Sequence, residues 1–197
     1  MTFAGEPGRD NATVPRAACR VTAACQAQLV NVIAPIMTEP GGRAWRQTIF
    51  LPFALTARLA TGTVLRVEPQ SPTYQTQRFG TVPVLDATAT FDPDTGQVTV
   101  FAVNRDVTGP VEMSVSLAGF GDLEVAEAWI VGGGDPYESN TGDEPNRVQP
   151  QPWGSAAVSG SRLTASLPPV AWGRLELDDH TPVQSSAQER RVDPGRQ

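Results

Sequence analysis

The chain has 197 residues, of which 40% are hydrophobic, and its formal net charge at pH 7 is −6. Its length suits one large domain or one domain with a smaller piece attached, and its 18 glycines and 18 prolines favour a loop-rich β protein over a helical one. The negative charge argues against nucleic acid and against an anionic membrane surface as partners, because both attract basic faces.

Residues 1–12 contain glycine, proline and aspartate without any period, and we expect them to be disordered. No apolar stretch typical of a secretory signal follows, and no apolar run reaches the length of a membrane span. The cytoplasm is therefore the expected compartment. Cys19 and Cys25 are expected to be free, buried thiols, because six residues of helix separate their Cα atoms by about 9 Å, too far for a disulfide.

Residues 13–62 are predicted to form an α-β-α unit. Apolar residues recur at helical spacing over 14–29, and the continuous apolar run 32–36 is typical of a strand buried on both faces. After a Pro-Gly-Gly loop, Thr48 is expected to cap a second helix that ends before Gly62. Such a unit corresponds to one repeat of an α/β barrel, without other repeats beside it.

Residues 63–177 are predicted to form a C-terminal antiparallel β-sandwich or jelly roll, so the fold class is mainly β. Short segments of alternating apolar and polar residues are separated by turn signals at regular spacing, as in such folds. The clearest pair, 85–91 and 97–104, is joined by a tight Asp-Pro-Asp-Thr-Gly reversal. Residues 178–197 are polar without a pattern and are expected to be a disordered tail. The predicted strands are 63–68, 74–79, 85–91, 97–104, 111–117, 123–131, 156–158, 162–167 and 171–177.

Several kinds of catalytic and metal site are excluded by the residue types present. The only histidine, His180, lies in the predicted tail, which removes Ser-His-Asp, Cys-His and His-ligated metal sites. The segment 132–146 is rich in Asp, Glu and Asn, whose oxygens are ligands for calcium, but their spacing does not match an EF-hand and a solvated loop is the more common interpretation. No cofactor and no metal ligand are assigned.

Carboxylates and tryptophans are the remaining candidates. A glycosidase needs two carboxyl groups about 5–10 Å apart across a cleft. Glu39 is the only carboxylate of residues 13–62, so it has no partner there and is interpreted as a loop residue. The three tryptophans of the predicted sandwich are interpreted as core residues rather than exposed sugar platforms. Trp45 follows the apolar run, where a barrel has its functional face, and both interpretations remain open for it.

Residues 25–65, CQAQLVNVIAPIMTEPGGRAWRQTIFLPFALTARLATGTVL, resemble the end of the catalytic barrel in α-L-arabinofuranosidases of glycoside hydrolase family 51. In that family an AQLVNVIAPI-like stretch, a Gly-containing loop and a WRQTIFYPF-like helix start close the barrel before the chain enters a β-sandwich. Residues 83–106 resemble the central hairpin of that sandwich, 140–150 its NT-x-x-x-P-x-x-V-x-P segment, and 167–177 its closing strand. The resemblance implies that 13–62 is the last β/α unit of a truncated (β/α)₈ barrel.

The resemblance also implies a function. Family members remove terminal arabinofuranosyl groups from arabinan or arabinoxylan with retention, using a glutamate nucleophile and a glutamate acid/base. Both lie upstream of the matched region, so no catalytic residue is assigned and the chain is expected to be inactive alone. Gln28 is implied to contact the sugar, and Trp45 to border the same site. Leu51 replaces a family tyrosine, and the likeness stops upstream of about Val21, which indicates a truncated gene product.

Two other functions remain open. One is a non-catalytic carbohydrate-binding module, which predicts exposed aromatic side chains on the sandwich. The other is a scaffold that docks to a barrel supplied in trans or joins copies of the chain in a homo-oligomer. That function predicts an exposed apolar patch over Ile33, Ile36, Phe50 and Phe53. Neither nucleic acid nor a membrane is an expected partner.

Overall fold

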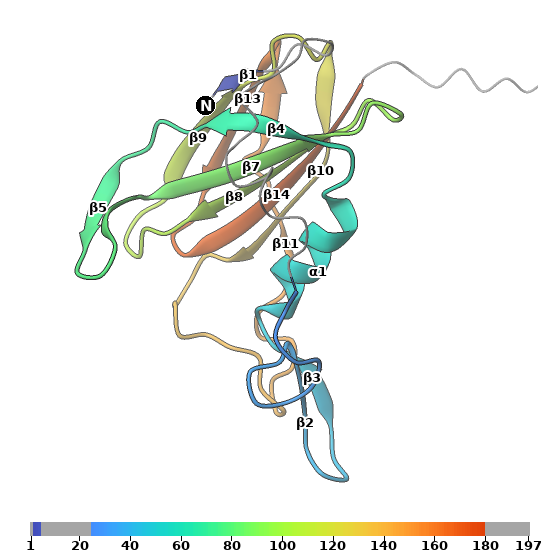
Figure 1. The fold of residues 1–197 in the computed structure, drawn as a ribbon, viewed down its shortest axis with the longest axis vertical. Helices are drawn as coiled ribbons and strands as arrows, with labels where there is room; N and C mark the ends of the chain where they lie inside the picture. Colours follow the sequence, from blue (N-terminus) through green and yellow to red (C-terminus); the bar gives the residue numbers. More distant parts are fainter. Residues whose placement is uncertain (1, 5–24, 180–197) are drawn as a thin grey trace, which may run out of the picture.

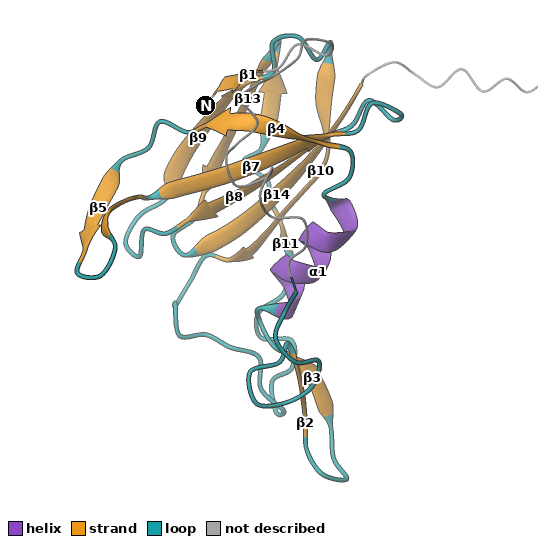
Figure 2. Ribbon diagram, in the orientation of Figure 1, coloured by secondary structure: helices purple, strands orange, loops and turns teal. Residues whose placement is uncertain are grey.

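The structure is a computed structural model that describes residues 2–4 and 25–179. It is mainly β, with antiparallel sheets in a sandwich-like arrangement and one short helix (Figures 1 and 2). The described part contains no helix that is both long and apolar enough to cross a membrane. The strands are β1 (Thr2–Ala4), β2 (Ile36–Thr38), β3 (Ala44–Arg46), β4 (Thr63–Glu68), β5 (Thr73–Thr76), β6 (Gly80–Pro83), β7 (Leu85–Phe91), β8 (Val98–Asn104), β9 (Val111–Ser116), β10 (Leu123–Gly132), β11 (Gln151–Pro152), β12 (Ala157–Ser159), β13 (Arg162–Leu167) and β14 (Ala171–Asp179), and the helix is α1 (Phe50–Leu59).

The two halves of the sandwich are continuous through β4. One half has the strand order β11-β10-β14-β8-β7-β4, and the other continues as β1-β9-β13-β12. Thr63–Leu65 of β4 pair with β7, whereas Arg66–Glu68 pair with β1, so a single strand passes from one half to the other. The pairing of β7 with β8 begins at Leu85 opposite Asn104, and the tight reversal at 92–96 joins these two strands as predicted.

The hydrophobic core lies between the two halves. Alternation along each strand directs every second side chain inward, so that Val100 and Leu175 of one half meet Val115 and Leu163 of the other. All four side chains are at most 1% exposed. This core confirms the predicted mainly β, antiparallel fold. The predicted strand boundaries agree with the observed ones to within two residues, except for the segment 74–79.

That segment turns back on itself. β5 and β6 form a separate two-stranded hairpin joined through residues 77–79, and the hairpin projects from the sandwich at the left of Figure 1. Thr76 stabilises the turn, because its hydroxyl donates to the Gly80 carbonyl and accepts from the Phe79 amide. Gly80 adopts a φ of +65°, which favours glycine.

The predicted helix and buried strand before β2 are not formed in the described part of that segment. Residues 25–35 are coil and turn, with left-handed φ values at Gln28, Asn31 and Val32, and only Ile36 of the apolar run lies in a strand. A strand of a parallel sheet needs strands along both edges and helices over both faces, whereas β2 pairs with β3 alone among the described strands and with Val30 through one isolated bridge to Ile36. Val32 and Ile33 are consequently 78% and 59% exposed.

The second predicted helix is present, but its start differs from the prediction. α1 begins at Phe50 with Ile49 as N-cap, and no side chain caps it. The Thr48 hydroxyl is buried and has no hydrogen-bond partner, so the prediction of a Thr48 cap is wrong. Gly62 follows the helix at a φ of +76°, where a left-handed glycine was expected.

Some predictions fall on residues that the structure does not describe. These are the disorder of 1–12 beyond β1, the helix over 13–24, the tail from 180 that contains His180, and the state of Cys19. Within the described part, Cys25 is a free cysteine as expected, but it is exposed rather than buried. The division of the chain into 1–12, 13–62, 63–177 and 178–197 remains a prediction.

Candidate functional site

The two residues implied to face the sugar lie on different parts of the segment before α1. Gln28 is an exposed loop residue with a φ of +57°. Trp45 is half-buried in β3, opposite Met37 of β2. Within residues 25–179, no hydrogen bond or ring contact joins the two side chains. Their roles in a sugar site therefore remain predictions.

Trp45 instead meets the long connection between β10 and β11, residues 133–150, which we call the acidic loop. The Arg43 guanidinium donates to the Gly142 carbonyl at 2.7 Å and pairs with the Asp143 carboxylate at 3.3 Å. A Cβ atom on Gly142 would lie 3.1 Å from Glu39 Oε1 and 3.2 Å from the Trp45 ring. The acidic loop therefore lies directly on the hairpin formed by β2 and β3, about one hundred residues away in sequence.

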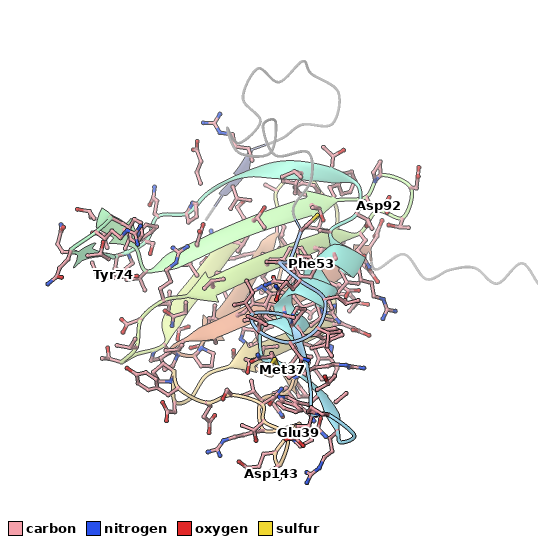
Figure 3. The ribbon with its side chains drawn as sticks, turned by 60° about the horizontal axis from the view of Figure 1, so that its bottom comes forward. Met37, Glu39, Phe53, Tyr74, Asp92 and Asp143 are labelled. Atoms are coloured by element: carbon pink, nitrogen blue, oxygen red, sulfur yellow. The ribbon has the colours of Figure 1, made fainter. Side chains whose placement is uncertain are left out.

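The figures show the same arrangement. In Figure 1 the acidic loop descends from the sandwich to lie beside β2 and β3. In Figure 3 Glu39 and Asp143 lie next to each other at the tip of this region. Sequence reasoning assigned Glu39 to a loop and left Trp45 open, but it did not foresee this contact, because no local spacing links the two segments.

The acidic loop is held by its own hydrogen bonds. Asn140 is only 5% exposed, and its amide both donates to the Val148 carbonyl at 3.0 Å and accepts from the Val148 amide at 2.7 Å. This reciprocal pair closes the loop as a backbone pair would close a hairpin. Asp135 accepts from the Tyr137 amide, and the Thr141 hydroxyl accepts from the Glu144 amide.

A hollow of about 210 Å³ lies on the acidic loop and is open to solvent. Arg147 bridges two of its carboxylates, at 2.7 Å from Glu144 and 3.4 Å from Glu138. The hydrogen bond that Arg147 donates to Glu144, followed by the negative charges of Glu144 and Glu138, raises the pKa of the Arg147 guanidinium. The residues lining the hollow are Asp135, Tyr137, Glu138, Ser139, Thr141, Glu144 and Arg147.

The described residues contain no group of three or more histidine, cysteine, aspartate or glutamate side chains arranged to hold a metal ion. The calcium interpretation of the acidic loop therefore has no support from the geometry. Because Arg147 offsets part of the negative charge, the hollow is a mixed polar surface rather than a bare anionic one.

The tryptophans of the sandwich have structural roles. Trp153 is 4% exposed in the core, and its Nε1 donates to the Ser166 carbonyl at 2.7 Å. Trp172 is half-buried, with its ring centroid 6.0 Å from that of Phe101. Trp129 is also half-buried, and its Nε1 donates to Glu127. The core interpretation is confirmed for Trp153, whereas the other two lie at partly covered positions.

A second cluster of charge lies on the outer face of β14 and β10. Arg174 is 6% exposed and forms ion pairs with Glu127, at 2.6 Å, and with Glu176. The hydrogen bond from Arg174, followed by that from Trp129, lowers the pKa of the Glu127 carboxyl. Arg58, in the last turn of α1, adds a smaller attraction. This cluster has the contacts of a structural ion-pair network.

The family model described as the α-L-arabinofuranosidase C-terminal domain matches residues 12–171. The chain belongs to that family. It is 48% identical over 169 residues to an intracellular exo-α-(1→5)-L-arabinofuranosidase of Streptomyces lividans, covering 86% of this chain and 25% of the relative. It is 43% identical to an exo-α-(1→6)-L-arabinofuranosidase of Bifidobacterium longum, covering 84% of this chain and 32% of the relative.

Comparison with solved structures supports the same family. A family 51 α-L-arabinofuranosidase of Bifidobacterium longum superposes with a TM-score of 0.74 at 42% identity, over 80% of this chain and 31% of that one. The family 51 arabinofuranosidase of Xanthomonas axonopodis pv. citri gives a TM-score of 0.69 at 27% identity, over 77% and 30%. The resemblance to glycoside hydrolase family 51 is thereby confirmed, and the chain spans about a quarter to a third of these relatives.

Proposed function

We propose that this chain is the C-terminal portion of a family 51 α-L-arabinofuranosidase that releases terminal arabinofuranosyl groups from arabinan or arabinoxylan with retention. The observation that carries the proposal is the family match over 12–171, together with relatives that are named exo-α-L-arabinofuranosidases. Because the Streptomyces lividans relative and an exo-α-(1→5)-L-arabinofuranosidase of Bifidobacterium longum are named intracellular, the cytoplasm is the proposed compartment.

The chain is proposed to have no hydrolytic activity by itself. A retaining glycosidase needs two carboxyl groups about 5–5.5 Å apart, one of them free to act as nucleophile. Glu39 lies against Gly42 and Gly142, and Glu138 and Glu144 share the Arg147 guanidinium. These contacts favour a supporting role for these three carboxylates over an acid/base pair.

Incubation of the purified chain with p-nitrophenyl α-L-arabinofuranoside tests this proposal. We expect no release of p-nitrophenol above the buffer blank, while a full-length family 51 enzyme assayed beside it turns the substrate over. Turnover that disappears in Glu39→Gln but persists in the exposed-site control Glu68→Gln would overturn the inactivity of the chain.

A scaffold function in trans is the second candidate, favoured by exposed apolar side chains before α1. Leu29 is 72% exposed, and Val32, Ile33 and Phe53 are exposed as well, whereas Ile36 and Phe50 are half-buried. A barrel docked at this face would cover them. Co-expression with the barrel portion of a relative should then yield a co-purifying, active complex, and separate elution of the two pieces would count against the scaffold function.

A further inference from the structure

The hollow on the acidic loop has no role in the proposed function. We propose that it is a contact subsite for a sugar unit of an arabinofuranosyl oligosaccharide, with Tyr137 as the stacking platform. The substrate class in this inference rests on the proposed function. The subsite itself rests on the chemistry of the hollow and on the closeness of Gly142, which belongs to the same loop, to the Trp45 ring.

The lining residues offer what a neutral polyhydroxylated ligand needs. Tyr137 is 90% exposed, so its ring is free to cover the apolar face of a sugar ring. Glu138 and Glu144 accept hydrogen bonds from hydroxyl groups, Arg147 donates them, and Ser139 can do both. An aromatic face that lies beside hydrogen-bond donors and acceptors is suited to binding a carbohydrate.

The charge pattern favours a neutral ligand over an ion. A cation would face the Arg147 guanidinium, which is already paired with both glutamates. An anion would face three carboxylates, those of Asp135, Glu138 and Glu144. A sugar hydroxyl carries no net charge, so neither the guanidinium nor the carboxylates repel it. It can donate a hydrogen bond to a carboxylate or accept one from the guanidinium.

The dimensions indicate a subsite rather than a complete binding site. Pockets that enclose a whole drug-sized ligand measure about 300–1,000 Å³. The hollow measures about 210 Å³ and is open on one side, so it fits part of an oligosaccharide. Tyr137 is held in place before a ligand binds, because its amide donates a hydrogen bond to Asp135 and because Asn140 closes the loop through its hydrogen bond to Val148. Less ordering is then needed on binding.

The position of the loop connects the hollow with the proposed activity. Active sites of barrel enzymes lie on the loops that follow the barrel strands. Under the proposed function, the segment that carries Glu39 and Trp45 would follow the last barrel strand, and Gly142 of the acidic loop lies against both side chains. A sugar chain that reaches a barrel site could therefore extend over the acidic loop, where Tyr137 would contact a unit other than the one being cleaved.

A tyrosine-specific NMR experiment on the full chain tests the subsite. The chain has two tyrosines, Tyr137 in the hollow and Tyr74 on β5, and Tyr74 serves as the internal control. With ring-¹³C tyrosine, Tyr74→Phe and Tyr137→Phe assign the two sets of signals. Titration with α-(1→5)-linked arabinotriose should shift the Tyr137 signals to saturation and leave the Tyr74 signals in place.

Matched variants measure the stacking contribution. Loss of the ring in Tyr137→Ala should weaken binding by about fivefold or more, followed through the amide signals of Ser139 and Thr141. Tyr137→Phe keeps the ring and should retain most of the affinity, and Tyr74→Ala should bind as the unchanged chain does.

Three outcomes would overturn the subsite. These are Tyr137 signals that do not move, signals of both tyrosines that move in parallel, and calcium chloride that shifts Tyr137 and displaces the sugar. The failure of this inference differs from failure of the proposed function, because hydrolysis by the chain is measured separately. An inactive chain that does not bind the sugar overturns the subsite alone, and an active chain overturns its proposed inactivity alone.

Discussion

Asn104 shows how one polar side chain organises an end of the sandwich. It is 1% exposed at the end of β8, and its Nδ2 donates to the carbonyls of Gly109, Leu167 and Pro168 at about 3 Å. Its Oδ1 accepts from the Asp106 amide at 2.9 Å. One side chain thus joins β8 to the turn before β9 and to the end of β13.

Asn104→Ala should destabilise the fold by about 2–4 kcal/mol, because it leaves several buried carbonyls and one amide without partners. Urea unfolding followed by tryptophan fluorescence measures the change. Asn146→Ala, at an exposed position of the acidic loop, is the control and should stay within about 0.5 kcal/mol of the unchanged chain. Equal stabilities of the two variants would refute the role given to Asn104.

Asp106 gives a prediction of pH dependence. The Thr108 hydroxyl, followed by the amides of Thr108 and Gly109, donates to its carboxylate and lowers its pKa below the ordinary value of 3.8. A carboxyl whose pKa is lower in the folded state stabilises the fold above its unfolded pKa, and this contribution is lost as the pH falls through the folded pKa.

The stability difference between the unchanged chain and Asp106→Asn should therefore narrow as the pH falls below about 4. Unfolding curves at a series of pH values measure it, and ¹³C NMR titration of the Asp106 carboxyl gives its pKa directly. Thr108→Val removes the largest cause and should bring that pKa back toward the ordinary value. An unchanged pKa in Thr108→Val would show that this hydrogen bond is not the cause.

At the scale of elements, the connection from α1 to β4 depends on a glycine. Gly62 has a φ of +76°, and a Cβ atom there would lie 2.2 Å from the Phe91 carbonyl oxygen. The backbone of the connection therefore lies directly against the end of β7. Any side chain at this position would push the helix away from the sandwich.

Gly62→Ala and Gly96→Ala form a matched pair, because Gly96 has a φ of +75° and no atom within 4 Å of its Cβ position. Gly96→Ala should cost about 1–2 kcal/mol for the left-handed backbone alone. Gly62→Ala adds the clash with Phe91 and should cost at least about 2 kcal/mol more. Thermal unfolding of both variants measures the difference, and equal costs would contradict the close approach to β7.

Most strands of the sandwich were predicted from local alternation even where their partners are distant, as for β14, but a pairing was predicted only for two strands joined by a short turn. β7 and β8 alternate cleanly and are joined by a five-residue reversal, so their pairing follows from local pattern. The apolar run 32–36 has the composition of a buried strand but lacks described strands on both sides, so local pattern gave the wrong element. The contact of Arg43 with Gly142 spans 99 residues and left no sign in either segment.

At the scale of the whole molecule, apolar side chains are buried in the sandwich but exposed in the segment before α1. The sandwich encloses its own core, with Val98, Val115 and Leu163 fully buried. The described segment 25–49 has the opposite character, because Leu29, Val32 and Ile33 face solvent although the run 32–36 has the composition of a buried strand. Among residues 25–49 the one buried hydrophobic residue in the core is Ala34. The described part of the chain thus combines a sandwich that buries its core with a segment whose apolar side chains are exposed.

This uncovered surface predicts that the free chain self-associates. Leu29, Val32 and Ile33 are 72%, 78% and 59% exposed within five positions of each other, and clustered apolar surface of this kind marks interaction sites. Sedimentation velocity should give an average sedimentation coefficient that rises with protein concentration.

The double variant Val32→Ser/Ile33→Ser should remove this rise, because it replaces the two most prominent neighbouring side chains with polar ones. Val107→Ser, at an isolated site that is 67% exposed, should behave as the unchanged chain. A chain that stays monomeric at all concentrations would mean that these side chains do not form an interaction surface, and the scaffold function would lose its main support.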